Sequence, residues 1–146
     1  ADLSGGITMD ALSHRFGSRI GRCGVGAVGY FIAAGAMLAG TLVDDGRLAG
    51  LLIAVGGAAS MFTLAPAWST AIGLGGRNAG VLSATMNTAG QVGGILSPIV
   101  LAYIVDRFNN WSAPLHVLSA LYLMASVCWL FIRPEAEAAT VRSAAS

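Results

Sequence analysis

The 146-residue chain is 55% hydrophobic and only 10% charged, with a formal net charge of +1 and a mean hydropathy of +0.73. Soluble domains carry about 25% charged residues, so this composition excludes an ordinary soluble enzyme and predicts an integral membrane protein. We therefore expect a lipid bilayer as the surroundings of the chain, no enzymatic activity and no nucleic-acid partner.

The first segment, residues 1–22, has an apolar patch that is too short to cross a bilayer. We interpret it as the last turns of a helix whose beginning lies outside the sequence, followed by a loop that carries three arginines. The alternative is a polar N-terminal arm.

Four uncharged stretches follow, at 23–43, 48–76, 78–105 and 108–132. Each is long enough to cross the hydrocarbon core, which takes about 20 helical residues. Backbone amides have no water to bond in lipid, so these stretches are predicted to be helices. The expected fold is all-α, with four transmembrane helices and the end of a fifth; the helices should lie at about 23–43, 48–72, 79–105 and 114–132.

Three glycines in the first stretch have the G-x-G-x-x-G spacing of a dinucleotide-binding turn: Gly24, Gly26 and Gly29. That turn needs a buried strand directly before it, whereas the preceding residues 13–22 contain three arginines. We therefore interpret these glycines, with Gly35 and Gly40, as packing positions that let helices approach closely. No cofactor and no metal are expected.

Arginines alone carry the topological signal, because the chain has no lysine. Four spans place the connecting segments alternately on two sides of the membrane, and the side richer in arginine faces the cytoplasm. This predicts both ends of the chain in the cytoplasm, with one side carrying Arg15, Arg19, Arg22, Arg77, Arg133 and Arg142 and the other only Arg47 and Arg107.

A polar stripe marks the third span, where Ser83, Asn87 and Gln91 are spaced four apart and share one helix face. Such side chains at bilayer depth need partners. They could form interhelical hydrogen bonds, worth about 0.6 kcal/mol each, or they could line a watery cavity. We favour the cavity, because Gly90 and Gly94 form a G-x-x-x-G face beside the stripe.

Two of the spans contain a proline: Pro66 interrupts the second span, and Pro98 lies on the outer half of the third. A proline frees a backbone carbonyl and bends a membrane helix, which is common where a helix lines a cavity or must flex. No Asp, Glu or Arg stands inside the four spans. Groups that bind protons or a substrate anion by charge are therefore expected outside these helices.

Several segments together resemble the C-terminal half of a major facilitator superfamily transporter. They are Gly6-x-x-x-Asp10 followed by Arg15-Phe16-Gly17-x-Arg19, then "APAW" at 65–68, "GVLSATMNTAGQVGGILSPIVLAYIV" at 80–105 and "NNWSAPLHVLSALYLMASVCWLFIRPE" at 109–135. The branch with the closest likeness is that of the anion:cation symporters, which includes carriers of hexuronates, glucarate and galactonate.

The resemblance implies a twelve-helix fold of two six-helix halves, with the substrate held between them. Residues 1–22 would be the end of helix eight and the cytoplasmic loop to helix nine, residues 23–133 would hold helices nine to twelve, and residues 134–146 would form a cytoplasmic tail. The loop motif would comprise Gly6, Asp10, Arg15 and Arg19, loosened by Ala11 where a basic residue is usual.

The same resemblance implies a substrate site that contains Trp68 and Asn87, and the polar stripe adds Gln91 and Ser83. Packing or an interfacial position is an equally good interpretation of Trp68. The expected function is secondary active transport of a small organic anion such as a sugar acid across a bacterial inner membrane. Alternating access, coupling to protons or another cation, and a missing N-terminal half are part of this expectation. The alternative is a four-helix membrane scaffold or accessory subunit.

Overall fold

The computed structural model of the chain describes residues 1–17, 20–110 and 112–132. These ranges fold into helices joined by short turns and contain no strand, so the predicted all-α class is confirmed. The elements in chain order are α1 (Asp2–Phe16), the π-helical turn η1 (Ile20–Gly24), α2 (Val25–Thr41), α3 (Gly46–Phe62), α4 (Leu64–Gly75), the 3-10 turn η2 (Gly76–Asn78), α5 (Ala79–Phe108) and α6 (Ala113–Phe131).

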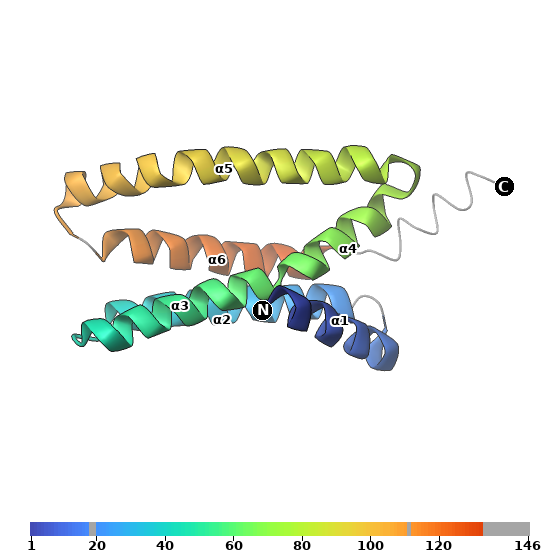
Figure 1. Ribbon diagram of the computed structural model, residues 1–146, viewed down its shortest axis with the longest axis horizontal. Coiled ribbons are helices and arrows are strands. Elements are labelled where there is room, and N and C mark those ends of the chain that lie inside the picture. The colour runs from blue at the N-terminus through green and yellow to red at the C-terminus, as the bar shows by residue number, and fades with distance from the viewer. Residues whose placement is uncertain (18–19, 111, 133–146) are drawn as a thin grey trace.

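Three stretches of the described chain are long and apolar enough to cross a membrane: Ile20–Thr41, Gly46–Phe108 and Ala113–Phe131. The middle stretch has 63 residues and would be about 95 Å long as one straight helix, three times the hydrocarbon thickness. It does not run straight. The chain reverses at η2, so that α5 returns beside α4 (Figure 1).

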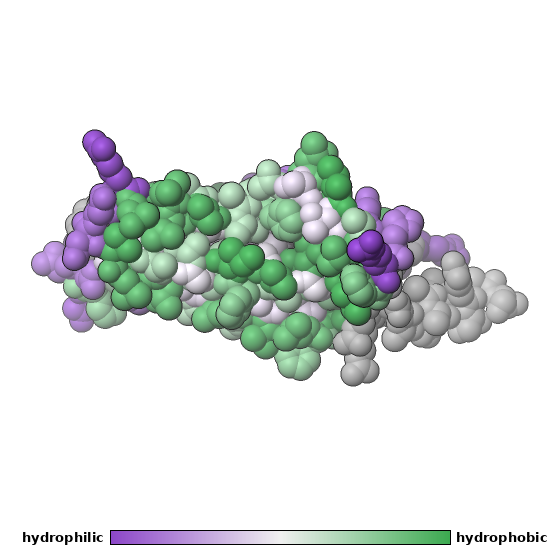
Figure 2. Space-filling view, turned by 90° about the horizontal axis from the view of Figure 1, so that it is seen from below, coloured by the Kyte–Doolittle hydropathy of each residue, from purple (hydrophilic) through white to green (hydrophobic). Residues whose placement is uncertain are grey.

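The outer surface of the bundle is apolar along its middle and polar at its ends. Figure 2 shows hydrophobic residues across the central part of one face and hydrophilic residues at both extremities. Side chains such as Phe31, Ile95 and Leu130 are exposed on the bundle. A surface of this size and kind needs lipid around it, which identifies the chain as part of an integral membrane protein.

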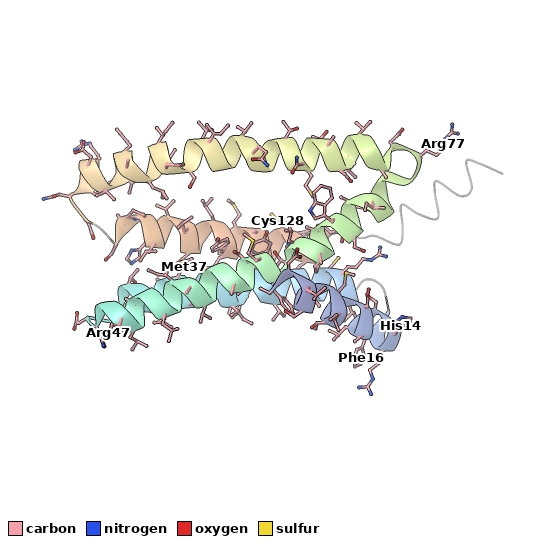
Figure 3. All side chains as sticks on the ribbon, viewed as in Figure 1. His14, Phe16, Met37, Arg47, Arg77 and Cys128 are labelled. Carbon is pink, nitrogen blue, oxygen red and sulfur yellow. The ribbon has the colours of Figure 1, made fainter. Side chains whose placement is uncertain are left out.

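Arginines lie at both ends of the bundle, as alternating passes require. Arg47 lies at one end and Arg77 at the other, where His14 also lies (Figure 3). Which end faces the cytoplasm stays a prediction. Three residues on which the topology or the loop motif depended lie outside the described ranges: Arg19, Arg133 and Arg142.

The core is formed by α2, which packs between α3 and α6. Gly26 lies against the indole of Trp129, and a β-carbon at position 26 would come within 2.6 Å of its ring carbons. Next to this contact the Ser126 hydroxyl donates to the carbonyl oxygen of Ala27 at 2.8 Å. The missing side chain of Gly26 leaves room for the Trp129 ring, so α2 and α6 pack closely at a glycine, as predicted for this position.

The other glycines of the first span differ in what lies next to them. Gly29 lies against Thr63 of the α3–α4 junction, and a β-carbon at Gly40 would lie 3.6 Å from the Ala49 carbonyl oxygen of α3. Among the described residues, a β-carbon at Gly24 would meet only the preceding turn of its own helix, and one at Gly35 would meet no atom within 4 Å. The packing interpretation is therefore confirmed at Gly26, Gly29 and Gly40, whereas at Gly24 and Gly35 it stays a prediction, because no other helix lies against them within the described residues.

The second span breaks at Thr63, between α3 and α4, as Pro66 predicted. Proline has no N–H, so the carbonyl of Phe62, four residues earlier, loses its helical partner. That carbonyl oxygen lies against Gly5 of α1, which has no side chain to exclude it. Thr63 itself is fully buried. Pro98 acts differently, because α5 continues through it from Ala79 to Phe108.

Candidate functional site

The helix α5 is the least covered element of the described bundle. None of its residues is buried, and its contacts are mainly with α4 and to a small extent with α6. Added β-carbons at Gly80, Gly90, Gly93 and Gly94 would meet nothing within 4 Å. The G-x-x-x-G face formed by Gly90 and Gly94 therefore has no packing partner within the described residues.

The polar stripe runs along this open helix. Ser83 is half-buried, whereas Asn87 and Gln91 are exposed. The Ser83 hydroxyl oxygen is buried and has no hydrogen-bond partner among the described residues. The stripe therefore forms none of the interhelical hydrogen bonds of the packing interpretation within the described ranges. The carboxamides of Asn87 and Gln91 are both exposed on a membrane helix.

Trp68 lies on the helix that precedes the stripe. It is seven residues from Gly75, which places both on one face of α4. At the turn into α5, a β-carbon at Gly75 would lie 3.2 Å from the Ala79 side chain and 3.6 Å from Leu82. The Trp68 side chain is 36% exposed. The structure therefore brings Trp68 and the polar stripe to the two arms of one helical hairpin.

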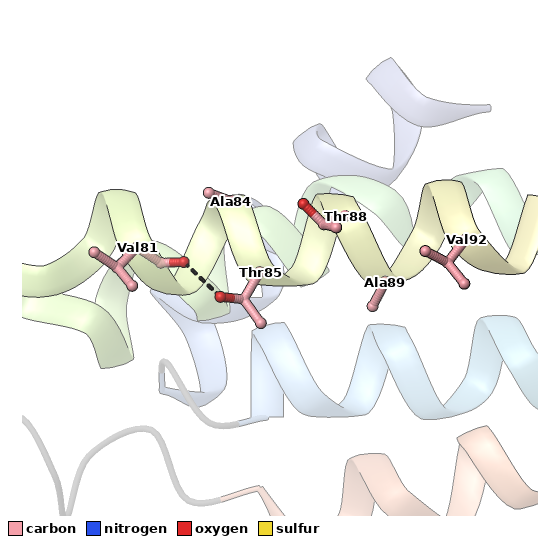
Figure 4. A pocket seen from close by; sticks show the side chains of 6 residues that line it. All are labelled: Val81, Ala84, Thr85, Thr88, Ala89 and Val92. Carbon is pink, nitrogen blue, oxygen red and sulfur yellow. Dashed lines mark hydrogen bonds between the residues drawn. The ribbon is translucent and has the colours of Figure 1, made fainter.

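A depression of about 690 Å³ follows another face of α5 (Figure 4). At 100° per residue, this face is about 130° around the helix from the stripe, so the stripe does not line the depression. The Thr85 hydroxyl donates to the Val81 carbonyl oxygen at 2.9 Å and is occupied within its own helix. The residues that line the depression are Val81, Ala84, Thr85, Thr88, Ala89 and Val92.

Sequence reasoning missed this second face, although its signal was present. Val81, Thr85, Thr88 and Val92 are spaced by four, three and four residues, the spacing of one helix face. A face with two threonines among apolar residues is a weaker polar signal than three aligned hydrogen-bonding side chains, two of them carboxamides.

The predicted loop motif is not gathered into one cluster in the described residues. Gly6 is half-buried in α1, where a β-carbon would lie 3.6 Å from the Ala65 side chain of α4. Asp10 and Arg15 are exposed on α1 and form no ion pair within the described ranges. Gly6 therefore packs against α4, while Asp10 and Arg15 face outward.

Arg22 lies three residues after the motif. Among the described residues its side chain contacts another helix, which the side chains of Asp10 and Arg15 do not. Its guanidinium nitrogen Nη1 would lie 2.8 Å from a β-carbon at Gly73, so the side chain rests on the last turns of α4. A cation is favourable at the carbonyl end of a helix. This contact connects the α1–α2 link to the α4–α5 hairpin, a role that the sequence alone did not indicate for Arg22.

No family model and no solved structure matches the chain. A probable sulfoacetate transporter of Cupriavidus necator is 30% identical over 137 residues, which cover 91% of this chain and 31% of the relative. A probable galactarate/D-glucarate transporter of Escherichia coli K12 is 34% identical over 53 residues, or 36% of this chain and 12% of the relative. The protein YjhE of the same organism is 30% identical over 77 residues, or 53% of this chain and 94% of that protein.

Two of these relatives are named as transporters and neither of the two as an enzyme. The chain spans about a third of the length of the sulfoacetate transporter and a smaller part of the galactarate/D-glucarate transporter. It is thus related to membrane transporters that are much longer than its own 146 residues.

Proposed function

We propose that this chain, which belongs to a family of membrane transporters, is the C-terminal part of a secondary active transporter for a small organic anion. The partial coverage of the longer relatives supports this. In this proposal the fold is the twelve-helix major facilitator fold, the chain supplies helices nine to twelve, and the missing N-terminal half provides the other wall of the substrate path. Both ends of the chain are proposed to face the cytoplasm of a bacterial-type inner membrane.

The observation that carries the proposal is the open polar stripe on α5. Exposed Asn87 and Gln91, with Ser83 beside them, present donors and acceptors along about two turns of a membrane helix. Lipid cannot satisfy such groups, so they need either protein partners or a watery path. A substrate rich in oxygen atoms provides acceptors for the amide N–H groups and, where it carries hydroxyls, donors for the amide oxygens.

The names of the relatives, sulfoacetate in one and galactarate or glucarate in another, support the proposed substrate class. We propose a small organic anion of this kind, with Trp68 packed against its carbon skeleton and the stripe bonded to its oxygens. The middle of the spans contains no acidic or basic side chain. The positive charge that binds the anion, and the group that couples transport to protons or another cation, are therefore assigned to other helices of the complete protein.

Alternating access is proposed to use the break at Thr63. The α4–α5 hairpin carries both Trp68 and the stripe, and it is joined to α3 at a point where one helical hydrogen bond is already missing. A small rotation at this break would move both parts of the site together.

Uptake measurements on the complete protein test the proposal. Cells or proteoliposomes should accumulate one member of a panel containing sulfoacetate, galactarate, glucarate and hexuronates, and a collapsed proton or sodium gradient should abolish accumulation. Uptake that persists unchanged without any ion gradient would refute the coupling. If no organic anion were moved at all, the scaffold interpretation would replace the transporter.

A further inference from the structure

The contact between Arg22 and the end of α4 joins two parts of the bundle that are far apart in sequence. Arg22 belongs to the π-helical turn η1 and is half-buried. Its nitrogen Nη1 would lie 2.8 Å from a β-carbon at Gly73. Because Gly73 has no side chain, the guanidinium rests directly on the backbone of the last turns of α4.

The end of α4 lacks the capping that most helices of the bundle have. Each of α1, α2, α3 and α6 ends with a backbone N–H that donates to a carbonyl of its last turn. At the end of α4, Gly76 has φ 46° and makes no such bond among the described residues, and the last turn of α4 contains no basic side chain. The last carbonyls of a helix need partners, and a cation near them is favourable. Arg22 therefore supplies from η1 the positive charge that α4 does not supply itself.

The backbone around Arg22 is closely packed on both sides. A β-carbon at Gly21 would lie 2.6 Å from the Ser13 nitrogen of α1. On the other side, Cys23 belongs to a buried cluster with Ala27 and Trp129. A π-helical turn is rare and is frequently found at functional sites. Arg22 thus extends from a fixed point on α1 and α2 toward α4.

The contact lies far from the break at which α4 begins. Gly73 is about 15 Å along the helix from Thr63, and α4 slants from the end of α3 to α5 (Figure 1). A contact near the far end of a lever restrains its angle more strongly than one near the pivot. Thr70 lies on the same side of α4 as Gly73, but its buried hydroxyl has no hydrogen-bond partner among the described residues. Arg22 therefore restrains the hairpin without a second polar contact from Thr70.

We propose that Arg22 is a positioning residue, which holds the α4–α5 hairpin in one conformation of the transporter by capping α4. The contact is lost when the hairpin rotates at the Thr63 break. This inference rests on the proposed function, because that rotation is part of the proposed alternating access. Arg22 acts through the placement of Trp68 and the polar stripe and is not itself a ligand of the substrate.

Pulsed electron paramagnetic resonance on the complete protein in lipid nanodiscs tests the proposal. Spin labels are attached through Phe16→Cys on α1 and Val81→Cys on α5, both at exposed positions, after Cys128→Ser removes an exposed thiol. Two populations of distances are expected, one with Arg22 on α4, called latched, and one released. The control pair, Phe16→Cys with Leu51→Cys on α3, should give one distance that no variant changes.

Variants of Arg22 separate its charge from its packing. Arg22→Gln should lower the ratio of latched to released protein about two- to fivefold, the range for losing a cation at a helix C-terminus. Arg22→Lys keeps a positive charge and should restore most of the ratio. Arg77→Gln is the matched control, because Arg77 is exposed in η2, and it should leave the ratio unchanged.

Gly73→Ala tests the same contact from the side of α4. The added methyl group would meet the end of the Arg22 side chain, which is flexible and can move away while the helix stays folded. The variant should lower the ratio of latched to released protein. In a protein that already carries Arg22→Gln it should have no further effect.

Three results would overturn the inference: a single distance population in the protein with Arg22, an unchanged ratio in Arg22→Gln, or a lower melting temperature of Arg22→Gln with an unchanged ratio. Uptake by the same variants is measured separately. Populations that shift in a protein that moves no organic anion would support the role of Arg22 and refute the transport proposal. Normal uptake with a ratio that ignores Arg22→Gln would support transport and refute the role of Arg22.

Discussion

The carbonyl oxygen of Phe62 lies so close to the α-carbon of Gly5 that a β-carbon at position 5 would overlap it. This is the carbonyl that Pro66 leaves without a helical partner. The break in the second span and the glycine in α1 therefore belong together, because Gly5 leaves the space that the freed Phe62 carbonyl occupies. Together with Thr63 against Gly29, they connect the break to both neighbouring helices.

Gly5→Ala should destabilise the protein by about 1–3 kcal/mol, the range for overpacking a filled site. The added methyl would meet backbone, which cannot turn aside as a flexible side chain does. Thermal unfolding of the purified protein in detergent measures the effect. Gly57→Ala is the matched control, because a β-carbon there would meet no described atom within 4 Å. Equal melting temperatures for both variants would contradict this account of the break.

The link to Pro66 has its own test. Alanine at position 66 supplies an N–H that can bind the Phe62 carbonyl and draw it back into the helix. The effects of Gly5→Ala and Pro66→Ala should therefore be non-additive, with a coupling free energy of about 0.5–3 kcal/mol in a double-mutant cycle. Additive effects would mean that the two residues act separately.

The contact between Gly26 and Trp129 predicts a second packing effect. Gly26→Ala would push a methyl group against the indole ring and separate α2 from α6, at a cost of about 1–3 kcal/mol in unfolding free energy. Gly35→Ala on the same helix should be neutral or slightly stabilising, since its surroundings are open and alanine favours helix over glycine. If the Gly26→Ala protein were as stable as its Gly35→Ala control, α2 and α6 would have room for a methyl group between them, and the close packing at Gly26 would be refuted.

The hydrogen bond from Ser126 to Ala27 joins residues that are 99 positions apart in sequence. Ser126→Ala should cost about 0.6 kcal/mol, the typical value for a polar contact between membrane helices. Ser119→Ala is the matched control, because that buried hydroxyl donates to Leu115 within its own helix. The difference in unfolding free energy between the two variants isolates the interhelical bond, and no difference would mean that it contributes nothing.

The membrane class and the helical elements followed from local sequence properties. Uncharged stretches of sufficient length must be helices in lipid. A proline removes one helical hydrogen bond, so a disturbance near Pro66 could be anticipated, but α5 continues through Pro98 and shows that a proline alone does not predict a break. What could not be anticipated is where the freed carbonyl goes. Gly5 lies far earlier in the sequence than Phe62, and only the packing of α1 on the α3–α4 break brings the two together.

The same limit applies to the candidate site. The spacing of Ser83, Asn87 and Gln91 predicted a shared face, but periodicity does not say what that face meets. Arg22 was counted only as a topological charge, because its contact with Gly73 depends on how two distant turns approach. Gly35 is a glycine like Gly26, yet open space surrounds it. A glycine pattern predicts where close packing is allowed and not where it occurs.

Asn87 provides the test that separates the two interpretations of the polar stripe. In the complete transporter Asn87→Ala should weaken substrate binding by about 1–3 kcal/mol, because a polar group of the bound substrate loses its partner. Stability should change little, since Asn87 is exposed. Thr85→Ala, on another face of α5 and with its hydroxyl already bonded to Val81, should leave affinity unchanged. Calorimetric binding and thermal unfolding on the same preparations give both quantities; a destabilised Asn87→Ala protein with normal affinity would mean that Asn87 packs against another helix and does not contact substrate.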